Sequence, residues 1–221
     1  MRPINQYIDH TLLKATATTN DIAMLCEEAK IHKFFSVCIN SCHVALAKEK
    51  LQDSDVKICS VVGFPLGSMS TKAKVAEATL ALNNGADEID MVINLGLLKS
   101  KNFDGVWKDI EAVKKCMPNN ILKVILETCY LEELEIIKAS ELAIQSGADF
   151  IKTSTGFGPG GATLHDVKLM KSVCSNGTKI KASGGIRDYK TAMEYINLGV
   201  DRLGTSSGIA ILKGASSNSN Y

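Results

Sequence analysis

Short apolar runs alternate with longer segments of helical periodicity along the whole of this 221-residue chain. The runs expected to form strands span residues 7–9, 34–39, 57–62, 87–94, 121–127, 149–153, 179–183 and 201–205. The expected helices include residues 21–31, 71–84, 104–116, 131–146 and 164–174. These eight alternations, with no linker between them, predict a single (β/α)8 TIM barrel over residues 1–213 and a flexible tail over residues 214–221. A doubly wound open sheet is the alternative.

Residues that favour helix ends lie at the expected boundaries. Thr19 and Ser70 are candidate N-caps, because their hydroxyl oxygens can accept from free N–H groups of the first helical turn. The pairs 84–85 and 146–147 are Asn-Gly and Ser-Gly, and glycine commonly ends a helix just before a strand.

The expected strands have one apolar face and one unusually polar face. In residues 87–94, Ile89 and Met91 share a face, whereas Glu88 and Asp90 share the other. The polar face of the expected strands includes Asp9, Ser36, Cys38, Glu88, Asp90, Lys123, Glu127, Lys152 and Lys181. The lumen of a TIM barrel is ordinarily filled with branched aliphatic side chains. Because burying charge is costly, a charged lumen indicates a functional site.

Two lysines near the ends of expected strands suggest a specific chemistry. Lys152 and Lys181 are 29 residues apart, about one strand-helix-strand unit, so they are expected on neighbouring parallel strands about 4.8 Å apart. Two amines this close oppose each other's protonation, which favours a neutral nucleophile and a Schiff base. Lowering a lysine pKa from about 10.4 to about 7 costs roughly 4 to 5 kcal/mol.

Lys152 is our candidate nucleophile and Lys181 the cation beside it, although spacing alone does not decide between them. Asp90 is expected to act as a general acid and base through water. The alternative is that both lysines are salt-bridged structural residues of the barrel.

Glycine-rich loops follow the last two expected strands. Gly184 and Gly185 follow residues 179–183, and residues 204–208 (GTSSG) lead into a short apolar helix at 209–212. Barrels commonly bind phosphate in these two loops, because backbone N–H groups there can approach the anion. Simple tight turns are the alternative. Residues 156–161 (GFGPGG) match G-x-G-x-x-G only formally, because they contain Pro159 and lack the following acidic residue.

Net charge and cysteine content argue against a nucleic-acid-binding, membrane-binding or disulfide-bonded protein. The net charge of +1 predicts no strong attraction to nucleic acid or membrane. The seven cysteines include no Cys-x-x-Cys pair, which indicates free thiols in a reducing compartment and favours the cytoplasm. The four histidines lack a metal-binding spacing, so no metal site is expected.

Five segments together resemble the deoxyribose-phosphate aldolase family. They are residues 8–13 (IDHTLL), 61–67 (VVGFPLG), 88–94 (EIDMVIN), 150–156 (FIKTSTG) and 181–187 (KASGGIR), and the similarity extends from about residue 7 to 212. The resemblance implies a class I aldolase that reversibly cleaves 2-deoxy-D-ribose 5-phosphate to acetaldehyde and D-glyceraldehyde 3-phosphate. It implies no metal or organic cofactor.

The resemblance also implies roles for individual residues. It gives Lys152 as the Schiff-base lysine, Lys181 as the second lysine and Asp90 as the proton-transfer acid. Asp9, Thr11 and Cys38 would line the substrate chain, and Lys123 would support the charge network. The residues implied for phosphate binding are Gly156, Gly184, Gly185, Ser206 and Ser207.

Two positions deserve separate expectations. Some family members carry lysine where this chain has Phe157, so backbone amides here would carry more of the phosphate binding. In some relatives a C-terminal tyrosine folds over the site and speeds proton abstraction, a role that Tyr221 could take. Relatives are often dimers or larger, so a homodimer is expected. Another phosphate-binding barrel enzyme and a non-catalytic sugar-phosphate binder are the competing functions.

Overall fold

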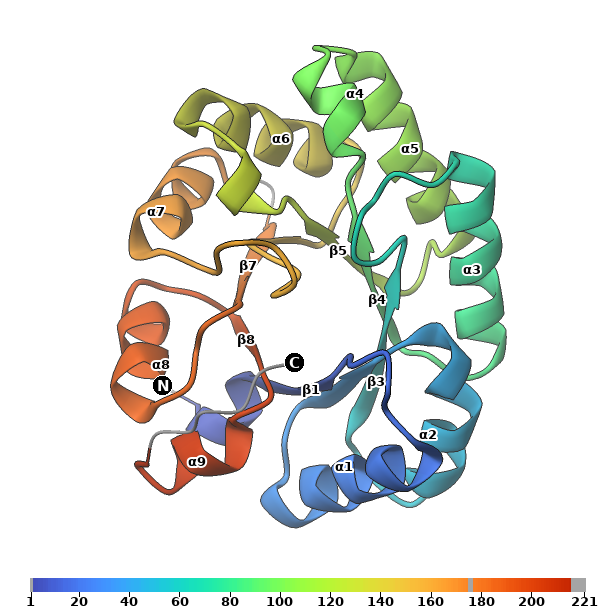
Figure 1. Cartoon of the computed structure of the whole chain (residues 1–221), viewed down its shortest axis with the longest axis vertical. Helices are drawn as coiled ribbons and strands as arrows, with labels where there is room; N and C mark the ends of the chain where they lie inside the picture. The colour runs from blue at the N-terminus through green and yellow to red at the C-terminus, as the bar shows by residue number, and fades with distance from the viewer. Residues whose placement is uncertain (1, 175–176, 216–221) are drawn as a thin grey trace.

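A computed structural model describes residues 2–174 and 177–215 of the chain. Their strands close into one parallel barrel in sequence order, which confirms the predicted (β/α)8 fold and excludes the open sheet (Figure 1). The strands are β1 (Ile8–Leu12), β2 (Ser36–Ile39), β3 (Lys57–Val62), β4 (Glu88–Val92), β5 (Ile121–Ile125), β6 (Phe150–Lys152), β7 (Lys179–Ser183) and β8 (Arg202–Thr205).

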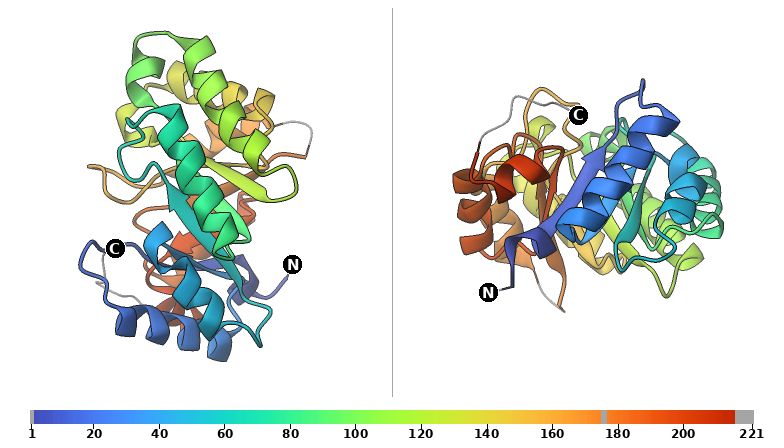
Figure 2. Two further views of the ribbon diagram at one scale, coloured as in Figure 1. Left: turned by 90° about the vertical axis from the view of Figure 1, so that its right-hand side faces the viewer. Right: turned by 90° about the horizontal axis from the view of Figure 1, so that it is seen from below.

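Helices form an outer layer around the strands, as Figures 1 and 2 show. They are α1 (Thr19–His32), α2 (Val44–Lys50), α3 (Thr71–Asn83), α4 (Leu95–Lys99), α5 (Phe103–Cys116), α6 (Glu133–Gln145), α7 (Leu164–Val173), α8 (Tyr189–Asn197) and α9 (Gly208–Leu212). Short 3-10 helices are η1 (Ile4–Tyr7), η2 (Ser41–His43) and η3 (Thr128–Tyr130). None of the helices in the described ranges is both long and apolar enough to cross a membrane.

The helix boundaries follow the capping residues closely. The expected N-cap at Thr19 is wrong by one residue, because Thr18 forms a capping box with Asp21 and Thr19 is already helical. Ser70 caps α3 as expected, accepting from the Ala73 N–H. The helix ends at Asn84 and Ser146 are confirmed, and the glycine after each has a positive φ.

Three helices, α2, α4 and α8, were not predicted from periodicity. Two of them are short, and α8 begins at a strong local cap, since the Asp188 carboxylate accepts from Thr191 N–H. Strands β4 and β5 end two residues earlier than expected, and the chain turns away there, with Glu127 in a left-handed conformation. The expected division into a domain over 1–213 and a tail over 214–221 stays a prediction, since residues 216–221 lie outside the described part.

The main apolar core lies between the barrel and its helices, as the alternation predicts. Ile89, Met91, Val124 and Ile151 point outward from their strands and are fully buried in it. The opposite faces of the same strands point into the lumen, where charged side chains take the place of the usual aliphatic layers.

Candidate active site

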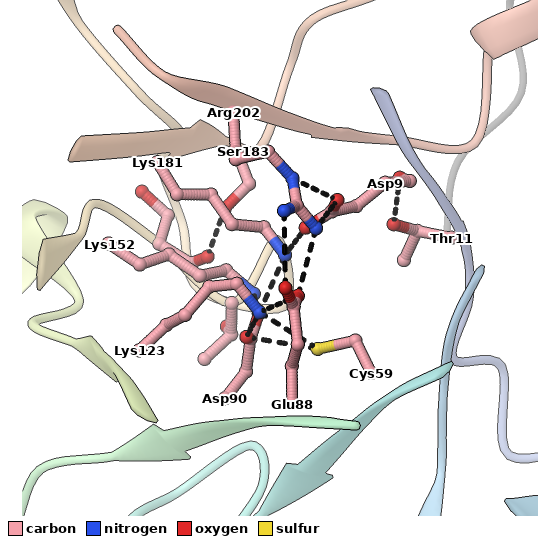
Figure 3. A network of polar contacts seen from close by, with 12 residues as sticks. Asp9, Thr11, Cys59, Glu88, Asp90, Lys123, Lys152, Lys181, Ser183 and Arg202 are labelled. Atoms are coloured by element: carbon pink, nitrogen blue, oxygen red, sulfur yellow. Dashed lines mark hydrogen bonds and ion pairs between the residues drawn. The ribbon is translucent and has the colours of Figure 1, made fainter. Parts of the chain in front are cut away.

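Charged side chains from six strands converge inside the barrel (Figure 3). Asp9, Glu88, Asp90, Lys123, Lys152, Lys181 and Arg202 have exposed fractions of 0 to 2%. An isolated buried charge is very costly, so such groups persist only when they are paired and hydrogen-bonded. The partners of each charge therefore define the site.

The predicted proximity of the two lysines is confirmed. Lys152 of β6 and Lys181 of β7 are paired across their strands. Their ammonium nitrogens lie 2.8 and 2.7 Å from the same oxygen atom, Oδ2 of Asp90 on β4. One carboxylate oxygen thus holds both amines within about two hydrogen-bond lengths of each other.

The ion pairs close into a ring. From Arg202 it passes through Asp9, Lys181, Asp90, Lys123 and Glu88, and returns to Arg202. The nitrogen–oxygen distances around it run from 2.5 to 2.9 Å. Cations and anions alternate, so the ring has three of each and no net charge.

Lys152 stands outside this ring and is bound to it through Asp90. Lys181 and Lys123 each contact two carboxylates, whereas Lys152 contacts one among the described residues, and shares it. Loss of the proton from Lys152 would leave three cations facing three carboxylates. Charge balance therefore distinguishes the two lysines, which their spacing in the sequence does not.

The ring keeps its members ionised. Burial by itself raises the pKa of Asp90, but Lys123, Lys152 and Lys181 outweigh it and hold this pKa well below its usual range. Burial would likewise lower the pKa of Lys181, yet Asp9 and Asp90 raise it well above the ordinary value. Lys181 therefore stays a cation beside Lys152.

The other wall of the lumen is apolar and carries two thiols. Leu13, Cys38, Cys59 and Val61 form a small buried cluster with Phe64 packed against it. Thr11, also buried, is the strand partner of Cys38, and its hydroxyl donates to Asp9 O. The expected substrate-lining residues Asp9, Thr11 and Cys38 thus come from adjacent strands, and Lys123 lies in the ring, as the polar face predicts.

One group of potential metal ligands occurs in the described ranges. Cys38, Cys59 and Asp90 place their ligand atoms within 4.8 Å of one another. Both Asp90 oxygens already accept hydrogen bonds from lysine ammonium groups. These cations oppose the binding of a metal ion, so we interpret the group as part of the ion network.

The expected phosphate-binding residues lie in three consecutive loops, after β6, β7 and β8. Gly156, Gly184 and Gly185 have φ values of 88°, 87° and 81°, which glycine adopts without strain. Thr205 Oγ1 accepts from the Ser207 N–H and donates to Ile186 O, which ties the last two loops together. Ser206 lies between these two bonded positions.

Glycines also let the loops after β6 and β7 touch. A Cβ at Gly161 would lie 2.3 Å from Gly184 O, so a side chain there would force the loops apart. Glu127 holds the other end of the first loop, because its carboxylate accepts from the Thr155 N–H at 3.0 Å and from the Thr155 hydroxyl. These bonds hold the start of the loop next to the site.

A family model described as DeoC/LacD family aldolase matches residues 4–214. This chain belongs to the DeoC/LacD family of aldolases. A deoxyribose-phosphate aldolase of Finegoldia magna is 54% identical over 211 residues, which cover 96% of this chain and 99% of that protein. One of Lactococcus lactis is 51% identical over 218 residues, 99% of each chain.

Solved structures agree with the family assignment. A putative deoxyribose-phosphate aldolase from Coccidioides immitis superposes with a TM-score of 0.93 at 43% identity, covering 95% of this chain and 84% of the other. The enzyme from Aeropyrum pernix, described as tetrameric, has a TM-score of 0.88 at 32% identity and covers 95% and 89%. More distant barrels, such as DHDPS from Cyanidioschyzon merolae with a TM-score of 0.67 at 10% identity, share the fold alone.

Sequence reasoning about this aldolase missed four residues of the site. Arg202 closes the ion ring, Glu88 accepts from it, Cys59 donates to Asp90, and Glu127 holds the loop after β6. Alternation placed Glu88 and Glu127 on the polar face without a role, and an arginine inside an apolar strand was the available signal for Arg202. The expected role of Tyr221 falls outside the described residues and stays a prediction.

Proposed function

We propose that this DeoC/LacD aldolase reversibly cleaves 2-deoxy-D-ribose 5-phosphate to acetaldehyde and D-glyceraldehyde 3-phosphate through a Schiff base on Lys152. The observation that carries the proposal is the shared oxygen, Asp90 Oδ2, which accepts from both Lys152 and Lys181. The curated relatives at about 50% identity, named deoxyribose-phosphate aldolases, support the substrate.

In this mechanism the neutral Lys152 amine attacks the C1 aldehyde of the open-chain sugar and forms a carbinolamine. The protonated Lys181 donates a proton to the leaving hydroxyl, and the iminium ion forms as water departs, which leaves Lys181 as a neutral amine. Asp90 relays protons between the two amines and a water molecule, and it is ionised before and after each transfer. Its charge also stabilises the iminium cation that develops on Lys152.

Carbon–carbon cleavage follows from the same charge. The iminium nitrogen withdraws electrons as the C2–C3 bond breaks, and the C3 hydroxyl gives its proton through water to the neutral Lys181 amine, which is protonated again. D-Glyceraldehyde 3-phosphate leaves, and the remaining enamine is protonated and hydrolysed to acetaldehyde. The chemistry uses side chains of this chain and needs neither a metal nor an organic cofactor.

The substrate phosphate would bind at the three glycine loops. Backbone N–H groups near Gly156, Gly184 and Gly185, with Ser206 and Ser207, supply the donors at the carboxyl ends of β6, β7 and β8. Asp9, Thr11, Cys38 and Lys123 would line the path of the sugar between phosphate and imine. Tyr221 remains a candidate for closing the site from the C-terminus.

The test is release of D-glyceraldehyde 3-phosphate from 2-deoxyribose 5-phosphate in a coupled assay. Lys152→Ala is expected to abolish turnover and Lys181→Leu to lower it severely, whereas Lys72→Ala, on the exposed side of α3, serves as the control. Appreciable cleavage by Lys152→Ala would refute the mechanism. Activity confined to other phosphorylated substrates would refute the substrate and favour another barrel aldolase.

We also propose an assembly and a cellular compartment for this enzyme. A homodimer is proposed because relatives assemble, as the description of the A. pernix enzyme as tetrameric indicates. Sedimentation at micromolar concentration tests it, and a monomer would contradict it. We place the enzyme in the cytoplasm, because its seven cysteines are all free.

A further inference from the structure

Two cysteines on adjacent strands meet inside the lumen. Cys38 of β2 and Cys59 of β3 are paired across their strands, fully buried, and both free. Their sulfur atoms lie within 4.8 Å of each other. Neighbouring strands lie about 4.8 Å apart, inside the range of about 4.4 to 6.8 Å found between the Cα atoms of disulfide-bonded residues. Bond formation requires the sulfur atoms to close to about 2.05 Å, which rotation of the two side chains can supply while the strands keep their pairing.

The two thiols differ in reactivity. The neighbouring Cys59 thiol, helped by the charge of Lys181, lowers the pKa of Cys38 to about 7 despite its burial. Burial is the largest cause that raises the pKa of Cys59 well above its ordinary value, and the neighbouring Cys38 side chain and the charge of Asp90 act in the same direction. One sulfur is thus poised as a thiolate next to a protonated partner, the arrangement of an attacking and a resolving cysteine.

We propose that Cys38 and Cys59 form a reversible disulfide when a hydroperoxide enters the lumen, and that this bond switches the site off. The Cys38 thiolate attacks the distal oxygen of hydrogen peroxide, and the O–O bond breaks to give a sulfenic acid and hydroxide, which is protonated to water. The Cys59 sulfur then attacks the Cys38 sulfur. The S–O bond breaks, and the Cys59 proton leaves with the hydroxyl as a second water.

Loss of activity follows from what Cys59 does in the reduced state, and this part rests on the proposed function. Its thiol donates to Asp90 Oδ1 at 3.0 Å and lies 3.4 Å from Lys123 Nζ. A disulfide has no S–H, so Asp90 loses this donor while the Cys59 sulfur moves toward β2. Both changes fall on the carboxylate that positions Lys152 and Lys181.

The other cysteines provide internal controls. Cys26 is a buried residue of α1, and burial raises its pKa to about 11, so we expect its thiol to be unreactive toward peroxide. Cys42 is exposed and lies in the same tryptic peptide as Cys38, residues 34–48. The full-length Cys42→Ser protein therefore removes the ambiguity about which cysteine is linked to the peptide of residues 58–72, which contains Cys59.

The experiment treats full-length Cys42→Ser protein with hydrogen peroxide, blocks free thiols, digests it and measures the peptide masses. We expect the 34–48 and 58–72 peptides joined with the loss of two hydrogen atoms, separated again by dithiothreitol, with Cys26 unmodified. Cleavage activity should fall and return in parallel. The activity of Cys59→Ala is compared with the rate of the same variant before peroxide is added. Peroxide should inactivate this variant without forming a linked peptide. Dithiothreitol should not restore its activity once Cys38 is oxidised to the sulfinic acid.

The possible results distinguish the disulfide from its effect on activity. Inactivation of the Cys42→Ser protein with Cys38 oxidised but not linked to Cys59 overturns the proposal. A linked peptide with unchanged activity overturns the switch and leaves the bond. The linked peptide is detected whether or not the protein cleaves deoxyribose phosphate, so failure of the proposed function is recognised separately, by inactivity before peroxide is added.

Discussion

Replacing Glu88 with glutamine tests whether the ion ring is a single energetic unit. Glu88 contacts Lys123 at 2.6 Å and the two terminal nitrogens of Arg202 at 2.9 and 3.2 Å, all in the buried lumen. Glu88→Gln keeps the shape of the side chain and removes its charge. The ring would then hold two anions and three cations, with Lys152 as a fourth.

The expected cost follows from two opposing quantities. At an effective dielectric constant of about 20, a charge pair at 2.6 Å is worth about 6 kcal/mol. Part of this is offset, because the variant no longer has to remove a carboxylate from water. Breaking a buried pair by removing one partner typically costs about 3 to 5 kcal/mol, and we expect this loss in the free energy of unfolding.

Urea denaturation of the purified protein measures the effect, with an unchanged slope showing that both proteins unfold in the same way. The matched control is Glu88→Gln combined with Lys123→Met, which removes one charge of each sign. This double variant should be more stable than the sum of the single changes by about 1 to 3 kcal/mol. A loss below about 0.5 kcal/mol for Glu88→Gln would show that the ring is not ionised, and would refute the reasoning.

Three further predictions concern a second buried pair, the loop contact and acid stability. Asp109→Ala leaves the fully buried Lys74 ammonium without its carboxylate, so unfolding free energy should fall by about 3 to 5 kcal/mol in urea titrations; a change under about 1 kcal/mol contradicts this. Gly161→Ala places a Cβ 2.3 Å from Gly184 O, so KM for the sugar phosphate should rise by roughly 10-fold or more, whereas the Gly96→Ala control should leave KM unchanged. Asp90 and Asp9 have lowered pKa values in the folded state, so their stabilisation is complete above about pH 4 and is lost as pH falls toward those values. Each carboxylate contributes up to about 1.4 kcal/mol per pH unit to the slope of the free energy of unfolding against pH. Asp90→Asn should reduce this slope in acid, and a slope equal to that of the unsubstituted protein would contradict the lowered pKa of Asp90.

The fold could be predicted from the sequence because the patterns that indicate its strands and helices each lie within a few consecutive residues. All eight strands and their parallel order follow from short apolar runs, helix caps and glycine stops. Alternation also separated Ile89 and Met91, which pack under the helices, from Asp90, which points into the lumen. Short helices such as α4 escaped prediction, because five residues carry little periodic signal.

The site could be predicted only in part, because its ring depends on which strands face each other across the lumen. The Lys152–Lys181 proximity is a nearest-neighbour property and was predictable from spacing. The contact of Arg202 on β8 with Glu88 on β4 crosses the barrel. It could not be predicted from the spacing of the two residues in the sequence, because their strands are not neighbours in the sheet. The charge surplus at Lys152 emerges only once every partner in the ring is known.

The central claim is that Lys152, the amine in excess of the balanced ring, forms the Schiff base. Incubation with acetaldehyde, reduction by borohydride and peptide mass spectrometry tests it directly, since reduction converts the imine into a stable ethyl group. We predict that the ethyl group is found on Lys152, with Lys181 and Lys123 unmodified. An ethyl group on Lys181, or the absence of any lysine adduct in a protein that cleaves its substrate, would contradict the account.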